Sequence, residues 1–105
     1  MAKSLYTIQM DFKKANDCAI KLEEASRKLK KNAQECFKNE INKLRIYWQG
    51  ENAVAYINEC HNLMQQMEQT ANRMLEIANS IRTIAKNTYN ADIKARNIAL
   101  AKKQK

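Results

Sequence analysis

The residues that could do chemistry are few and lie far apart. The chain has one histidine, His61, and three cysteines, Cys18, Cys36 and Cys60. The cysteines are widely spaced and form no C-x-x-C pair. This spacing is typical neither of a disulfide framework nor of a zinc site. Cys60 and His61 are neighbours, so on a helix they point in different directions. We interpret all four residues as structural, with no bound metal and with three reduced thiols in the cytoplasm.

Catalysis has little support in the remaining residues. His61 has no serine or aspartate at a diagnostic spacing, and a single glycine excludes a glycine-rich phosphate loop. Paired acids such as Glu23 and Glu24 are interpreted as surface charges. We therefore expect no enzymatic activity, no cofactor and no small-molecule substrate.

The charge of the chain is strongly positive. There are 19 Lys and Arg against 11 Asp and Glu, giving a formal charge of +8. Two stretches concentrate the excess, "SRKLKK" at residues 26–31 and the tail at residues 94–105, which has no acid. Such a surplus favours acidic partners. A nucleic-acid-binding helix is the alternative, but acids interleave with most cations and Tyr47 and Trp48 are too few to form a stacking platform.

The elements that must position these residues are helices. There is one glycine and no proline, and only 7% of the residues are aromatic. An apolar stripe runs through the first half at intervals of 4, 3, 4, 3, 4, 3, 4, 4, 4, 3 and 4, with only Ser26 polar. This is the stripe of a long amphipathic helix. Its members are Ile8, Phe12, Ala15, Ala19, Leu22, Ser26, Leu29, Ala33, Phe37, Ile41, Leu44 and Trp48.

The second half carries a stripe with the strict alternation of a coiled coil. It runs from Ile57 to Thr88, and Leu63, Ile77 and Ile84 widen it on one flank. Because neither stripe can bury itself, we expect the helices to pack together and the wider flank to drive association into a four-helix bundle. The residues expected at these interfaces are Ile57, Met64, Met67, Met74, Ile81, Leu22, Leu29 and Phe37.

Between the stripes lies "RIYWQGENAVAY", residues 45–56, which contains the only tryptophan and the only glycine. Gly50 can adopt a positive φ in a tight reversal, and Gly50 or Asn52 can cap the following helix. Arg45 suits the carboxyl end of one helix and Glu51 the first turn of the next. We predict an all-α antiparallel hairpin in which Cys36 lies within about a turn of Cys60.

The expected organisation is a single domain over residues 1–105. Helix one spans about residues 5–46, the bend 47–51, helix two about 52–99, and a basic tail 100–105. The first 14 residues contain no apolar core of the length that a signal peptide needs, so we expect no cleaved leader. No apolar run reaches about 18 residues, so we expect no membrane span.

With its two amphipathic helices and the motif Trp48-Gln49-Gly50 at the bend, the whole chain resembles the WXG family. These are small helical hairpins exported by type VII secretion systems of Gram-positive bacteria and mycobacteria. The resemblance implies that the chain forms a homodimer or a heterodimer. It also implies that the chain is cytoplasmic before export without a cleaved leader, after which it is secreted or associated with the cell surface. It also assigns recognition by the secretion machinery to Trp48, with Gly50 shaping the turn. Alternatively, Trp48 simply caps the apolar seam.

The family's second signal is a carboxy-terminal tyrosine followed four positions later by an acid. Here Tyr89 and Asp92 are only three positions apart, although residues at this spacing share a helix face. The resemblance thus implies that Tyr89 and Asp92 form the export signal, or that a partner completes it. In the second case the chain is the targeting companion of a larger effector with a long helical (LXG-type) domain. A general coiled-coil adaptor is a further alternative.

Overall fold

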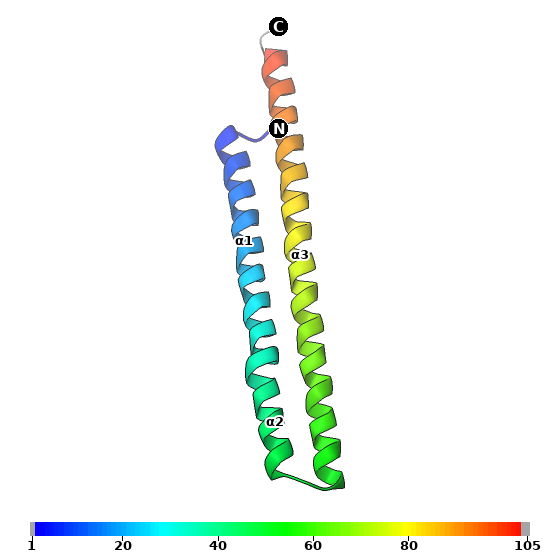
Figure 1. Cartoon of the computed structure of the whole chain (residues 1–105). Coiled ribbons are helices and arrows are strands. Elements are labelled where there is room, and N and C mark those ends of the chain that lie inside the picture. The colour runs from blue at the N-terminus through cyan, green and yellow to red at the C-terminus, as the bar shows by residue number, and fades with distance from the viewer. Residues whose placement is uncertain (1, 104–105) are drawn as a thin grey trace. The chain divides into compact units, whose positions relative to one another are not determined.

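The computed structural model describes residues 2–103, apart from the side chain of Cys36. Helix accounts for 94% of the described residues, and none of them is in a strand, which confirms the all-α prediction. The first helical stretch is continuous through α1 (Leu5–Lys31), η1 (Asn32–Phe37) and α2 (Lys38–Tyr47) (Figure 1). After a short bend, α3 (Glu51–Lys103) is a single helix that includes most of the expected basic tail.

The start of α1 is fixed by a serine cap. The backbone N–H of Thr7 donates to Ser4 Oγ at 3.2 Å, and the N–H of Ile8 donates to the Ser4 carbonyl at 3.0 Å. A serine hydroxyl in this position satisfies one of the amide donors that lack a partner in a first helical turn. This explains why the helix begins at Leu5.

The π-helical segment η1 coincides with the one irregularity in the first apolar stripe. Ala33, Phe37 and Ile41 are four residues apart where strict alternation would place one interval of three. In a regular α-helix one extra residue rotates all later side chains by about 100°. A π turn takes up an extra residue, and Ala33 and Ile41 are accordingly both buried. η1 therefore keeps the stripe in register on both of its sides.

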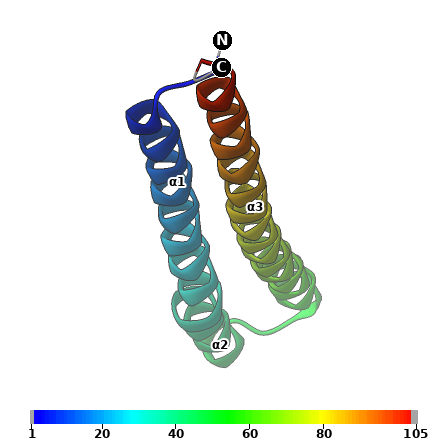
Figure 2. The same cartoon turned by 90° about the horizontal axis from the view of Figure 1, so that it is seen from above.

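The chain divides into two compact units. Unit 1 contains the residues before Glu23 and after Leu75, and unit 2 contains Glu23–Leu75. In unit 1 the first half of α1 lies antiparallel beside the part of α3 that follows Leu75, and the last turns of α3 extend past the start of α1 (Figures 1 and 2). Its buried apolar residues are Ile8, Ala19, Ala78 and Ala85. Three of these four are alanines, which allow two helices to approach closely.

Unit 2 is itself a helical hairpin, in which the chain reverses between α2 and α3. Its buried residues are Ser26, Ala33, Ile41, Ala53, Ile57 and Ala71. The one polar member is bonded across the hairpin, since Ser26 Oγ donates to the carbonyl of Ala71 at 2.6 Å. Only small side chains permit this approach of a hydroxyl to the backbone of the facing helix.

Among the described residues, no helix combines the length and the apolar character needed to cross a membrane.

Candidate interaction site

The bend joins a helix end to a helix start through three residues. Trp48 leaves the helical conformation, with φ −127° and ψ 114°, and its N–H donates to the Leu44 carbonyl at 2.8 Å. Gly50 has φ 117°, and its carbonyl accepts the N–H of Val54 at 3.0 Å, which starts α3. The positive φ expected at Gly50 is therefore present, and Gly50 rather than Asn52 provides the first bond of α3.

Trp48 lies at the bend with part of its indole open to solvent. Its exposed fraction is 43%, and its ring centroid is 5.4 Å from that of Tyr56 at an interplanar angle of 52°. Aromatic pairs prefer such tilted geometries. The tryptophan also borders a shallow hollow together with Arg45, Val54 and Asn58. The arrangement presents an amphipathic aromatic surface at the end of unit 2.

A second polar contact ties the bend together. Arg45 Nη2 lies 2.6 Å from His61 Nε2. Because a guanidinium can only donate, the hydrogen bond forms when Nε2 of His61 is the acceptor. Sequence reasoning gave His61 no role beyond structure, and this contact links the last turn of α2 to a residue about three turns into α3.

The interface residues predicted from the stripes face the seams of their own units to different degrees. Ile57 is buried, and the others are half-buried: Leu29, Phe37, Met64, Met67 and Met74 in unit 2, and Leu22 and Ile81 in unit 1. Half-burial leaves each of these side chains with area that a further helix can cover. Their role at an interface with a partner stays a prediction.

A row of large apolar side chains on α3 is left open beside the seam. Tyr56 and Leu63 belong to unit 2, and Ile77, Ile84 and Ile98 belong to unit 1. They follow a spacing of seven residues or multiples of seven, and their exposed fractions lie between 48% and 63%. Within each unit, a seven-residue repeat keeps these side chains on one side of the helix. We call these five residues the apolar row.

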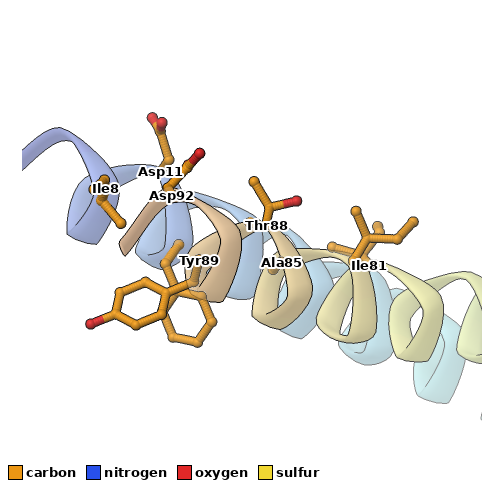
Figure 3. Close-up of a pocket in the computed structure, with 10 residues that line it drawn as sticks. Ile8, Asp11, Ile81, Ala85, Thr88, Tyr89 and Asp92 are labelled. Carbon is orange, nitrogen blue, oxygen red and sulfur yellow. The ribbon is translucent and has the colours of Figure 1, made fainter. Parts of the chain in front are cut away.

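Unit 1 contains a half-open cavity of about 210 Å³. Its walls are mainly apolar side chains of α1 and α3, among them Ile8, Phe12, Ile81 and Ile84. Asp11 and Asp92 lie at one edge, with their carboxylates pointing to the same side, whereas the ring of Tyr89 points to the opposite side (Figure 3).

The structure therefore separates the two residues of the candidate export pair. Tyr89 is half-buried, and its ring centroid lies 5.1 Å from that of Phe12 in α1. Asp92 instead forms an ion pair of 3.4 Å with Lys3. Sequence reasoning did not find Lys3, because a contact between the residues before α1 and the end of α3 leaves no local spacing signal.

Cys18 and Cys60 belong to no cluster of described residues that could bind a metal. Cys18 is exposed, Cys60 is half-buried, and both are free thiols. The side chain of Cys36 lies outside the described part of the chain, so its predicted proximity to Cys60 stays a prediction. Among the described residues there is no group of three or more His, Cys, Asp and Glu that could hold a metal ion.

Comparisons with known proteins give no relative for this chain: no family model matches it, and neither does any curated protein or solved structure.

Proposed function

We propose that this chain is a non-enzymatic helical protein of the type VII secretion pathway. It is either exported itself or accompanies a larger effector whose long helical domain it binds. The observation that carries the proposal is the apolar row, because five large side chains at helical spacing remain exposed on α3. Aligned apolar side chains of this kind are typical of protein interaction surfaces.

The association that fits the row is a four-helix bundle. Each unit is a pair of helices whose seam is half-buried and whose apolar row is exposed. A second helix pair packed against this side would cover both the seam residues and the row. For the isolated chain we propose a second copy as this partner. In the cell, the helical domain of an effector takes the same place, and the charge of +8 favours an acidic one.

The bend supports assignment to this pathway specifically. The motif Trp48-Gln49-Gly50 lies between two long helical stretches, with the indole partly open and Gly50 at a positive φ. An indole at the end of a helix pair offers a secretion receptor both apolar area and an N–H donor. In this proposal the chain is cytoplasmic before export, and it is exported by a secretion system that recognises its folded helices.

Substitution at the bend tests the proposal. Trp48→Ala should abolish export of the chain or of its co-expressed effector, while the urea midpoint of the purified protein changes little, since Trp48 is 43% exposed. Tyr47→Ala is the matched control, because Tyr47 is the neighbouring aromatic and is 85% exposed. Normal export of the Trp48→Ala protein would refute the recognition role. An equal loss of folding and export would instead make Trp48 a cap of the seam.

A separate binding experiment distinguishes the nucleic-acid alternative. Affinity for duplex DNA in the micromolar range or tighter at physiological salt, falling steeply as salt rises, would favour that alternative. The secretion proposal predicts no such binding, and it predicts that deletion of the gene stops export of one helical effector.

A further inference from the structure

Arg45 is held at the bend of unit 2 by a partner that carries no negative charge. Its Nη2 lies 2.6 Å from Nε2 of His61, and among the described residues no carboxylate forms an ion pair with it. An imidazole that accepts a hydrogen bond is uncharged. The contact therefore positions the guanidinium without compensating its charge, which stays available to a partner molecule.

The shallow hollow at the bend brings this charge next to apolar side chains. The hollow has a volume of about 380 Å³ and is lined by Arg45, Trp48, Val54, Ile57, Asn58 and residues 49–50. Among the described residues that line it, Arg45 is the only charged one, and Glu51 is not part of the wall. Trp48 and Val54 are 43% and 57% exposed. A molecule bound here would contact one cation and an apolar surface.

The guanidinium of Arg45 keeps donors for an anion after its contact with His61. A guanidinium has five N–H groups in one plane, and a carboxylate can accept two of them side by side. The contact with His61 involves only Nη2. A side chain that is already held in place also loses less conformational entropy on binding than a freely moving one. These properties suit a carboxylate that has an apolar group beside it.

We propose that this hollow binds an acidic peptide segment of the secretion receptor. A glutamate or aspartate of the segment accepts hydrogen bonds from Arg45, and an adjoining apolar side chain packs on Trp48 and Val54. His61 is a positioning residue, because it acts through Arg45. The inference rests on the proposed function for the identity of the receptor, and it agrees with the preference of a chain of charge +8 for acidic partners.

The test is an NMR titration of the isotopically labelled full chain with N-acetyl-leucyl-glutamyl amide at constant ionic strength. The chain has one tryptophan, so a single indole N–H resonance reports on the hollow. This resonance and that of the Arg45 Nε–H should shift together and saturate. The uncharged probe N-acetyl-leucyl-glutaminyl amide should bind about three- to tenfold more weakly, because it cannot form the charge-assisted pair.

Substitution of Arg45 identifies the cation that the probe contacts. Arg45→Gln should weaken binding of the acidic probe by the same factor and leave binding of the uncharged probe unchanged. Arg73→Gln is the matched control, since Arg73 is an exposed arginine of α3 in the same unit, and it should bind both probes as the wild type does.

Substitution of His61 tests the positioning role. His61→Gln retains an acceptor for Arg45 and should bind the acidic probe nearly as well as the wild type. His61→Leu has no acceptor, so Arg45 must be ordered on binding, and the affinity should fall by about two- to fivefold. Equal losses in the two variants would overturn the positioning role.

Three results would overturn the proposed site itself. They are equal affinity for the two probes, equal affinity of the wild type and Arg45→Gln for the acidic probe, and shifts confined to the basic stretch at residues 26–31. Because the probe is a bare peptide, these results do not depend on the export of the Trp48→Ala protein. Failure of the site and failure of the proposed function are therefore told apart.

Discussion

Gly50 turns the chain with a backbone conformation that side chains rarely permit. At φ 117° it lies beyond the left-handed helical region in which asparagine is tolerated, and no atom comes within 4 Å of a Cβ built there. Any loss of stability on substitution of Gly50 therefore comes from backbone strain and not from a steric clash of the new side chain. We predict that Gly50→Ala lowers the free energy of unfolding by about 1 to 2 kcal/mol, measured by urea denaturation.

Asparagine provides the control at this position. Gly50→Asn should destabilise the protein about as much as Gly50→Ala, because the tolerance of asparagine for positive φ is confined mostly to the left-handed helical region. Full stability of Gly50→Asn would mean that the bend uses the ordinary left-handed region instead.

Ser26 is a polar residue buried in a seam of alanines. Its hydroxyl donates to the Ala71 carbonyl at 2.6 Å, and its exposed fraction is 5%. Ser26→Ala removes one donor without leaving a cavity, so the expected loss of unfolding free energy is about 1 kcal/mol. Ser26→Leu forces a large side chain between closely packed helices and should cost about 1 to 3 kcal/mol.

The matched control for Ser26 is Ser80, which is exposed on α3. Ser80→Ala should change the unfolding free energy by less than about 0.5 kcal/mol. If Ser26→Leu is as stable as the wild type, the helices do not approach as closely as the hydrogen bond requires.

At the scale of the elements, the most informative segment is η1. It absorbs one residue between Ala33 and Ile41, and π hydrogen-bond geometry is rarely sustained beyond such a single turn. Deletion of Gln34, an exposed residue of η1, restores strict alternation in the first stripe. We predict that this variant is as stable as the wild type or more stable, and that η1 becomes α-helical.

Deletion of Lys21 is the control for this prediction, because Lys21 is equally exposed but lies in regular α-helix. The deletion rotates one side of the stripe by about 100° relative to the other, which takes apolar side chains out of the seam. Circular dichroism during thermal unfolding should show a large loss of stability for this variant alone. Similar losses in both deletions would contradict the role given to η1.

The helices and the bend could be predicted from sequence because their signals are local. Apolar spacing located both stripes, and the single glycine located the reversal at Gly50. The same intervals contained the extra residue at Phe37, but spacing alone does not say whether a helix absorbs it or the seam breaks.

Contacts between distant residues could not be predicted in the same way. Lys3 meets Asp92 and Trp48 meets Tyr56 only because the chain reverses, and neither pair has a characteristic spacing. The candidate export pair shows the same limit. The three-residue spacing predicted that Tyr89 and Asp92 share a helix face, whereas in the structure Tyr89 packs against Phe12 and Asp92 pairs with Lys3.

At the scale of the whole molecule, the apolar row and the positive charge would act on different steps of the proposed association. A charge of +8 would steer an acidic partner toward the chain, and salt would screen this attraction. The row supplies the area that is buried once a partner is in place, and burial of apolar surface contributes about 25 cal/mol per Å². The row, not the charge, should therefore determine whether the complex persists.

The most direct test of the account is sedimentation equilibrium of the chain and of two double variants. Ile77→Glu with Ile84→Glu places two charges in the apolar row. Ser80→Glu with Asn87→Glu places the same charges, at the same spacing, at exposed polar positions of α3. We predict that the wild type and the second variant self-associate to twice the chain mass of 12.2 kDa and that the first variant is a monomer. A wild type that stays monomeric at high concentration, or equal association of all three proteins, would contradict it.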